Sequence, residues 1–222
     1  MILAVAGTKG GGGKTTLATN LAVERAQSNS VLLIDGDEQG TSKIWAGVRE
    51  ENEITPAVPS LHFIGRPLET EKQIRAVFQE LEELAQQYGD LVIDVGGRNT
   101  DELRAVFIVA DLVVFPVKPS GADVWALAQT EALFAEAKVH NPGVTGSVVV
   151  NLASTNPPRS EAEDLEELFA DFAELEYSGI VLRNRVSYTR ALNDGLGVTE
   201  YRPRDAKAQS EVQTLFSYLY NG

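Results

Sequence analysis

The sequence predicts an α/β fold with a doubly wound, mostly parallel sheet flanked by helices. Short apolar runs rich in β-branched residues alternate with segments of helical periodicity, the pattern of strands joined by crossover helices. The expected strands cover 2–6, 31–35, 61–64, 90–94, 112–117, 147–151 and 179–182, and the expected later helices lie near 70–88, 101–109, 121–138, 160–175 and 205–220. The 222 residues fit one domain, 1–222, without room for an added DNA-reading module.

The first strand leads into a glycine-rich loop and then a helix. The loop reads Gly7-Thr-Lys-Gly-Gly-Gly-Gly-Lys-Thr-Thr16, and apolar residues continue at helical spacing after it. Consecutive glycines let backbone N–H groups point at phosphate oxygens, while the helix presents its positive dipole end to the same anion. The residues expected to cradle phosphate are Gly10, Gly11, Gly12, Gly13, Lys14, Thr15 and Thr16.

Within this loop, Lys14 is expected to contact the β- and γ-phosphates of ATP or ADP, and the Thr15 hydroxyl to bind Mg²⁺. One position departs from the ordinary pattern G-x-x-x-x-G-K-[ST], because Thr8 stands where the first glycine is expected. A phosphate-binding loop needs only one lysine, so Lys9 requires a separate explanation.

Residues 9–16 resemble the K-G-G-x-G-K-T-[ST] signature of the deviant Walker A ATPases of the ParA/MinD group, which are SIMIBI-like P-loop NTPases. The resemblance implies that Lys9 is catalytic and reaches across an ATP-bound homodimer to the phosphates held by the other subunit. Such a role is chemically reasonable, because positioned positive charge catalyses phosphoryl transfer. The alternative is a lysine exposed to solvent from a loop.

The second strand ends in Asp35-Gly-Asp-Glu-Gln-Gly40, which is similar to the family's D-x-D-P-Q-G. The resemblance implies that Asp37 orients the attacking water and helps to hold the metal shell, with Asp35 as a flanking, structural acid. Glu38 replaces the usual proline, so the stiffness of this loop is open.

A third strand ends at Asp94, a Walker B position whose carboxylate is expected to bind Mg²⁺ through water. Gly96 and Gly97 follow where a mobile switch loop would approach the γ-phosphate. Taken singly, any of these aspartates could cap a helix or end a strand.

Two further segments extend the resemblance to nearly the whole chain. The strand ending at Asn151 is similar to the family strand whose terminal asparagine faces the adenine, although a turn-forming asparagine is the alternative. Residues 197–211 look like the segment before the family's last helix, and Pro203 and Asp205 are expected to line the nucleotide site.

Length and composition narrow the subgroup. The chain matches the short, ParF-like plasmid partition ATPases, which also lack glycine at position 8. It contains no cysteine, which excludes disulfides, thiol nucleophiles and iron–sulfur sites. It starts with its first strand and has no apolar run near ~18 residues, so we expect no signal peptide and a cytoplasmic protein.

The formal net charge of −13 opposes binding to nucleic acid unless basic residues are segregated. Between residues 183 and 207 the basic side chains outnumber the acidic ones. We expect them to form a weak DNA-binding face that an ATP-bound dimer doubles, with ordinary salt bridges as the alternative. They are Arg183, Arg185, Arg190, Arg202, Arg204 and Lys207.

Three function classes follow. The first is a ParA-type ATPase that turns ATP and water into ADP and phosphate, slowly without a partner, and partitions plasmid DNA or another cargo on the nucleoid. A ParB-type centromere-binding protein or a cargo adaptor would stimulate it. The second is a MinD-like membrane switch, disfavoured because residues 209–222 include an apolar helical face but no Lys or Arg. The third, a bacterial tyrosine kinase, has too few C-terminal tyrosines. The motifs do not identify the cargo.

Overall fold

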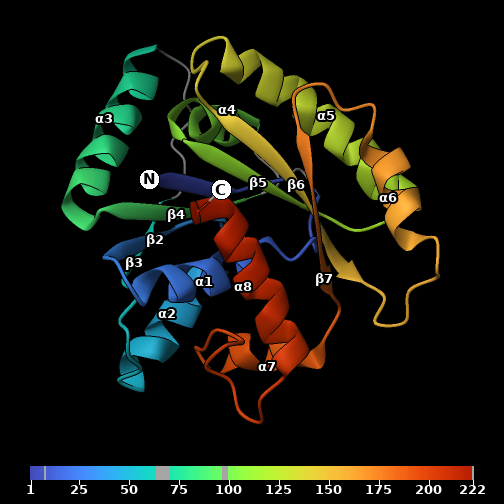
Figure 1. The fold of residues 1–222 in the computed structure, drawn as a ribbon. Coiled ribbons are helices and arrows are strands. Elements are labelled where there is room, and N and C mark those ends of the chain that lie inside the picture. Colours follow the sequence, from blue (N-terminus) through green and yellow to red (C-terminus); the bar gives the residue numbers. More distant parts are fainter. Residues whose placement is uncertain (8, 64–70, 97–99, 222) are drawn as a thin grey trace.

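The structure, a computed structural model, describes residues 1–7, 9–63, 71–96 and 100–221. It contains a seven-stranded sheet in the order β3-β2-β4-β1-β5-β6-β7, and every neighbouring pair is parallel (Figure 1). The strands are β1 (Ile2–Val5), β2 (Val31–Gly36), β3 (Ser60–His62), β4 (Asp90–Val95), β5 (Leu112–Val117), β6 (Thr145–Ala153) and β7 (Glu176–Arg183). The predicted α/β fold is therefore confirmed.

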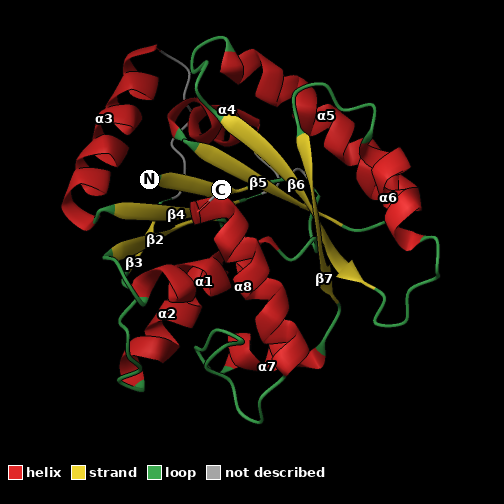
Figure 2. Cartoon of the chain, viewed as in Figure 1, coloured by secondary structure: helices red, strands yellow, loops and turns green. Residues whose placement is uncertain are grey.

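Helices cover both faces of the sheet (Figure 2). On one face lie α1 (Lys14–Ala26), α2 (Thr41–Glu51), α7 (Val186–Asn193) and α8 (Ala206–Asn221). On the other lie α3 (Glu71–Tyr88), α4 (Thr100–Val109), α5 (Gly121–Lys138) and α6 (Glu161–Phe169). The two layers make two separate apolar cores.

The strands contribute side chains to both cores, because successive side chains of a strand point to opposite faces of the sheet. In β1, Leu3 packs in the core beneath α1 and α8, whereas Ile2 and Ala4 pack in the core beneath α4 and α5. Successive side chains of a strand point to opposite faces, so a strand covered on both sides is apolar throughout. This is why the strands are continuous apolar runs in the sequence.

The helix predictions are incomplete in three places. Helices α2 and α7 were not expected, and α6 ends at Phe169 rather than near residue 175. The buried positions of α2 include Ser42 and Arg49 beside Trp45, so its apolar periodicity is broken by polar side chains that are nonetheless inside. The last turn of α6 has no basic residue, and acidic residues at that end oppose the helix dipole.

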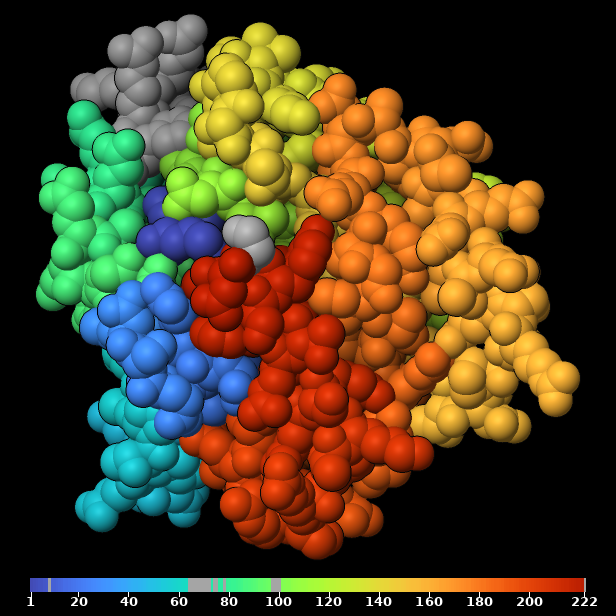
Figure 3. Space-filling view, viewed as in Figure 1, coloured from blue at the N-terminus to red at the C-terminus, as the bar shows by residue number. Residues whose placement is uncertain are grey.

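The C-terminal helix α8 lies across the face that carries α1. In Figure 3 its red surface lies between the blue surface of the N-terminal part and the orange surface of the β7 region. Its apolar residues Val212, Leu215 and Leu219 are buried in the core with α1. Of the helices within the described ranges, none has the length and apolarity needed to cross a membrane.

The strand order determines where a site can form. The chain starts at β1 in the middle of the sheet, with β4, β2 and β3 on one side and β5, β6 and β7 on the other, so β1 lies between β4 and β5. In such sheets, ligands bind in the crevice outside the carboxyl ends of the strands, where the winding direction reverses. The loops after β1, β2 and β4 meet at that edge.

Candidate functional site

The glycine loop joins β1 to α1 at this edge. Gly13 is the residue before the helix and has φ +84°, a left-handed conformation that suits glycine. A Cβ there would collide with the amide of Asn151, which donates to the Gly12 carbonyl oxygen at 2.8 Å. Glycine is therefore required at position 13 by backbone conformation and by close packing together. The first N–H groups of α1 have no partner within the helix.

A cleft with a volume of about 300 Å³ lies in front of this helix end. It is the size expected of a site for a small-molecule ligand. Its described lining comes from the loop, from the segment after β2 and from the start of α4, and comprises Gly10, Gly11, Gly13, Lys14, Thr15, Thr16, Gly36, Asp37, Glu38, Gln39, Thr41, Gly96 and Glu102. Thr8 and Gly97, both singled out from the sequence, lie outside the described residues.

Lys14 is the buried cation of the cleft. It is 8% exposed, and its Nζ donates to the Lys9 carbonyl oxygen at 3.2 Å. Burial lowers the pKa of Lys14, although the charges of Asp94 and Asp37 act in the opposite direction. A cation held in a partly desolvated cleft interacts strongly with an anion, so Lys14 is suited to binding phosphate.

A buried carboxylate stands next to it at the end of β4. Asp94 Oδ2 accepts from Thr15 Oγ1 at 2.7 Å and from Ser42 Oγ at 2.6 Å. The pKa of Asp94 is raised to about 6, mainly by burial. The hydrogen bonds from Ser42 and Thr15 and the charge of Lys14 oppose this shift, whereas the neighbouring charge of Asp35 contributes to it. Hydroxyl and carboxylate oxygens are the ligands that Mg²⁺ prefers, so this group fits a Mg²⁺–nucleotide complex.

The segment after β2 brings Asp37 to the same cleft. Asp35 is fully buried and organises this segment, because Oδ1 accepts from Asp37 N at 3.0 Å and Oδ2 from Lys43 N at 2.8 Å. Asp37 itself is half-buried and its Oδ1 accepts from Gln39 N at 3.0 Å. The structural role expected for Asp35 thus has a physical basis, and Asp37 remains accessible from the cleft.

Lys9 is not among the described residues that line the cleft. Its Nζ lies 2.9 Å from Asp123 Oδ2, near the start of α5, and its side chain is 46% exposed. Asp123 also hydrogen-bonds Ser120, the residue that caps α5. The Lys9 and Ser120 contacts hold the pKa of Asp123 below its usual value even though burial acts to raise it. The two lysines of the loop therefore have different environments.

The residues expected around the adenine lie apart from the cleft. Asn151 is buried, and besides donating to Gly12 it accepts from Leu152 N at 2.9 Å, so it braces the glycine loop. With Thr16 it lines a smaller hollow beside the loop. Asp205 caps α8, accepting from Ala208 N at 3.1 Å and from Ser187 Oγ at 2.8 Å, and Pro203 precedes it on an exposed turn.

The six predicted DNA-binding residues divide into two groups. Arg183 makes a bidentate ion pair with Glu161 at 2.5 and 2.6 Å, and Arg185 pairs with Glu211 at 2.6 Å. In the monomer these two arginines therefore make ordinary salt bridges, which was the alternative to a DNA-binding role. The remaining four are exposed: Arg190, Arg202, Arg204 and Lys207.

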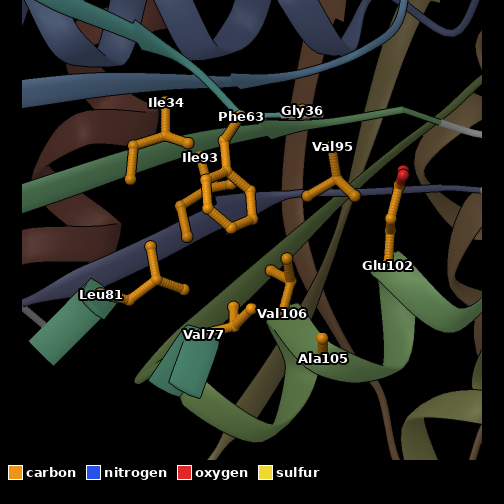
Figure 4. A pocket seen from close by; sticks show the side chains of 10 residues that line it. All are labelled: Ile34, Gly36, Phe63, Val77, Leu81, Ile93, Val95, Glu102, Ala105 and Val106. Atoms are coloured by element: carbon orange, nitrogen blue, oxygen red, sulfur yellow. The ribbon is translucent and has the colours of Figure 1, made fainter. Parts of the chain in front are cut away.

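A second hollow, between the sheet and helices α3 and α4, adjoins the cleft and shares Gly36 and Glu102 with it. Figure 4 shows its described lining, in which the charged side chain of Glu102 lies among apolar neighbours. Those described neighbours are Ile34, Phe63, Val77, Leu81, Ile93, Val95, Ala105 and Val106. An apolar hollow without a cation does not suit phosphate, so the polar cleft is the candidate site.

Sequence reasoning missed three residues that contact the site: Ser42, His62 and Asp123. Ser42 lies five residues after Asp37 and could have been found by extending the D-x-D motif into α2. Asp123 stands three residues after Ser120, a capping-box spacing, but its pairing with Lys9 has no local signal. His62 contacts Asp37 from another strand.

Comparison with known proteins gives relatives that match along nearly their full length. The chain is 29% identical over 219 residues to "Maintenance of carboxysome distribution protein A" of Halothiobacillus neapolitanus, covering 97% of this chain and 94% of the relative. It is 30% identical over 213 residues to the protein of that name from Gloeobacter kilaueensis, covering 93% and 87%. The solved structure of apo McdA from "Cyanthece" superimposes with a TM-score of 0.77 at 17% identity, covering 98% of each chain.

The family model of the CobQ/CobB/MinD/ParA nucleotide binding domain matches residues 3–198. This range runs from β1 through the glycine loop and both aspartate-ended strands to the segment before α8. The chain belongs to this family of nucleotide-binding domains, as a deviant Walker A ATPase of the ParA/MinD type.

Proposed function

We propose that this chain is an ATPase switch that dimerises when ATP is bound, hydrolyses ATP slowly and positions an intracellular cargo. The observation that carries the proposal is the difference between its two loop lysines. Lys14 is buried beside Asp94 within the cleft, whereas Lys9 is half exposed at the same edge and is held by Asp123. Lys14 can serve the nucleotide of its own subunit, and Lys9, once it leaves Asp123, can reach one held by a second copy.

In this proposal the backbone of the glycine loop and Lys14 bind the phosphates. Thr15 and Asp94 would hold Mg²⁺, and Ser42 keeps the Asp94 carboxylate oriented. When bound, Mg²⁺ neutralises charge that develops on the phosphates. Burial raises the pKa of Asp94, so the ionised form that a cation requires is favoured only above about pH 6 until the cation is present.

Asp37 orients the attacking water from the segment after β2. The site is completed only in the dimer, when Lys9 of the second copy leaves its Asp123 and contacts the phosphates bound by the first copy. Comparable switches turn over at ~10⁻⁴ to 10⁻² s⁻¹ until such a charge is supplied. We therefore infer a slow basal ATPase that an adaptor protein stimulates.

For the cargo we propose a protein microcompartment of the carboxysome kind. The sequence analysis expected plasmid DNA first, by similarity to short partition ATPases. Both curated relatives reported above are instead named for carboxysome distribution, and each aligns with more than nine-tenths of this chain. Pulldown with the ATP-bound protein tests this choice: recovery of a centromere-binding protein, rather than a microcompartment adaptor, would restore the plasmid assignment.

The nucleoid is the proposed track. Arg190, Arg202, Arg204 and Lys207 supply exposed positive charge, and a dimer would double it. Arg183 and Arg185 would have to leave their acidic partners first, so we rank them below the other four. The membrane alternative is not favoured, because the apolar side of α8 is already buried against α1.

Sedimentation of Asp37→Ala with ATP or ADP, with and without DNA, tests the switch. We expect an ATP-dependent dimer that binds DNA with a steep salt dependence. Arg190→Glu with Arg204→Glu should abolish DNA binding but not dimerisation. Arg104→Glu with Lys138→Glu is the matched control, since it reverses the same number of charges, on α4 and α5, on the opposite face of the sheet. A protein that stays monomeric with ATP would contradict the proposal.

A further inference from the structure

The segment that carries Asp37 is a tight turn. Gly40 N donates to the Asp37 carbonyl oxygen at 2.9 Å, which closes a four-residue turn over Asp37–Gly40. The turn has the preferred residues at its ends, aspartate first and glycine last. Asp35 ties the start of the segment to β2, as described above. These local contacts hold the ends of the turn, while Glu38 and Gln39 are exposed.

One contact reaches this turn from a different part of the chain. His62 Nε2 lies 3.0 Å from the Asp37 carbonyl oxygen, 25 residues away in sequence. A carbonyl oxygen can only accept a hydrogen bond, so Nε2 must be the nitrogen that carries the proton. His62 therefore donates to the backbone of the residue proposed to orient water.

The imidazole is well placed to act as a fixed support. His62 is the last residue of β3 and pairs in register with Asp35 of β2. The backbone continues this pairing, because Phe63 N donates to the Asp35 carbonyl oxygen at 2.8 Å. The ring also lies close to Gly40, since a Cβ at that position would be 3.6 Å from His62 Cε1. From a strand of the sheet, His62 thus hydrogen-bonds one end of the turn and lies close to the other.

The turn needs such a support because its second residue, Glu38, does not fix the backbone φ angle. Proline is favoured at the second position of a turn of this kind, since its ring fixes φ, whereas Glu38 leaves φ free. No hydrogen bond from the Glu38 N–H occurs among the described contacts, so proline there would remove none of them.

We propose that His62 is a positioning residue for hydrolysis, which holds the Asp37 turn through its Nε2–H and so replaces the stiffness that Glu38 lacks. The inference rests on the proposed function, in which Asp37 orients the attacking water. The side chain of His62 need not touch substrate. It should therefore affect turnover and the mobility of the turn, but not the affinity for ATP, which depends on the glycine loop and Lys14.

The test compares His62→Phe, which keeps a ring without the donor, with His62→Gln, whose amide nitrogen can donate in place of Nε2. A double variant, His62→Phe with Glu38→Pro, restores stiffness by a different route. His140→Phe is the matched control, because His140 is exposed after α5. The first measurement is hydrogen exchange of the Gly40 amide in the nucleotide-free protein. The second is steady-state ATP hydrolysis, with thermal unfolding as a check.

For His62→Phe we expect the Gly40 amide to exchange about three- to tenfold faster and kcat to fall by about three- to tenfold, the effect of losing one hydrogen bond. The KM for ATP should stay within about twofold of the wild-type value. His62→Gln and the double variant should recover most of both, and His140→Phe should match wild type. Unchanged exchange and kcat in His62→Phe would overturn the proposal. So would a fall in kcat that follows the unfolding temperature and that Glu38→Pro does not restore. If the wild-type protein has no ATPase activity but the Gly40 amide exchanges faster in His62→Phe, then His62 does hold the turn and it is the proposed function that is overturned.

Discussion

Replacing Arg49 by methionine should destabilise the protein strongly, because Arg49 is a buried cation with every donor in use. Its side chain is 1% exposed, and it forms a bidentate pair with Glu200 at 2.7 and 2.8 Å. The remaining N–H groups donate to the carbonyl oxygens of Pro56 at 2.7 and 2.9 Å and of Gly195 at 3.1 Å. The guanidinium also lies 5.6 Å from the centre of the Trp45 ring.

The magnitude follows from what the substitution leaves behind. Methionine fills similar space, so the main loss is charge compensation, and Glu200 retains only the Gly197 N–H among its described partners here. Breaking a buried pair in this way costs about 3–5 kcal/mol. For a chain of this size each kcal/mol lowers the unfolding temperature by about 2–4 °C, so the expected shift is roughly 6–20 °C.

Urea unfolding of the nucleotide-free protein, followed by circular dichroism, measures this loss. Arg49→Met with Glu200→Leu removes both charges and should be more stable than Arg49→Met alone. Arg104→Met is the control, since Arg104 pairs with Asp101 and Glu136 through half-exposed side chains and should lose about 0–1 kcal/mol. Equal losses for Arg49→Met and Arg104→Met, or additive losses in the double variant, would refute the reasoning.

Three further outcomes are expected. Lys14→Ala should abolish binding of a fluorescent ATP analogue without changing the circular dichroism spectrum, and binding within a few-fold of wild type would contradict the assignment of Lys14. Asp123→Asn should release Lys9 and lower the dissociation constant of the ATP-dependent dimer by up to about fivefold, because an ion pair whose lysine is half exposed contributes about 1 kcal/mol at most. Weaker dimerisation in analytical ultracentrifugation would argue against that release. Burial raises the pKa of Asp94 from 3.8 to about 6. Between about pH 4 and pH 6 the folded protein therefore keeps a proton on Asp94 that the unfolded chain has lost. The stability that this proton supplies is lost as the pH rises through that range. In Asp94→Asn the free energy of unfolding should decline by up to about 3 kcal/mol less over this pH range than in the wild type. The measurement is the urea midpoint of each protein as a function of pH, and parallel curves would rule out the raised pKa of Asp94.

The candidate site was predictable wherever its signal was local. Strand, glycine loop and helix follow one another within residues 2–26, and the β4 aspartate is the last polar residue of an apolar run. Periodicity failed at α2 because the side chains buried there include Ser42 and Arg49, whose burial is compensated by partners that include Asp94 and Glu200. Those partners lie 52 and 151 residues away.

The order of residues along the chain was enough to establish the parallel α/β fold, the phosphate-binding loop and the ATPase family, because these depend on local conformation and on spacing over a few residues. The tertiary structure decided what each charged side chain does. It buried Lys14, paired Lys9 with Asp123, engaged Arg183 and Arg185 with glutamates, and brought His62 to the Asp37 turn. Each of these depends on the distance between groups that are far apart in sequence, and electrostatic energy depends on that distance and on burial, neither of which a linear pattern contains.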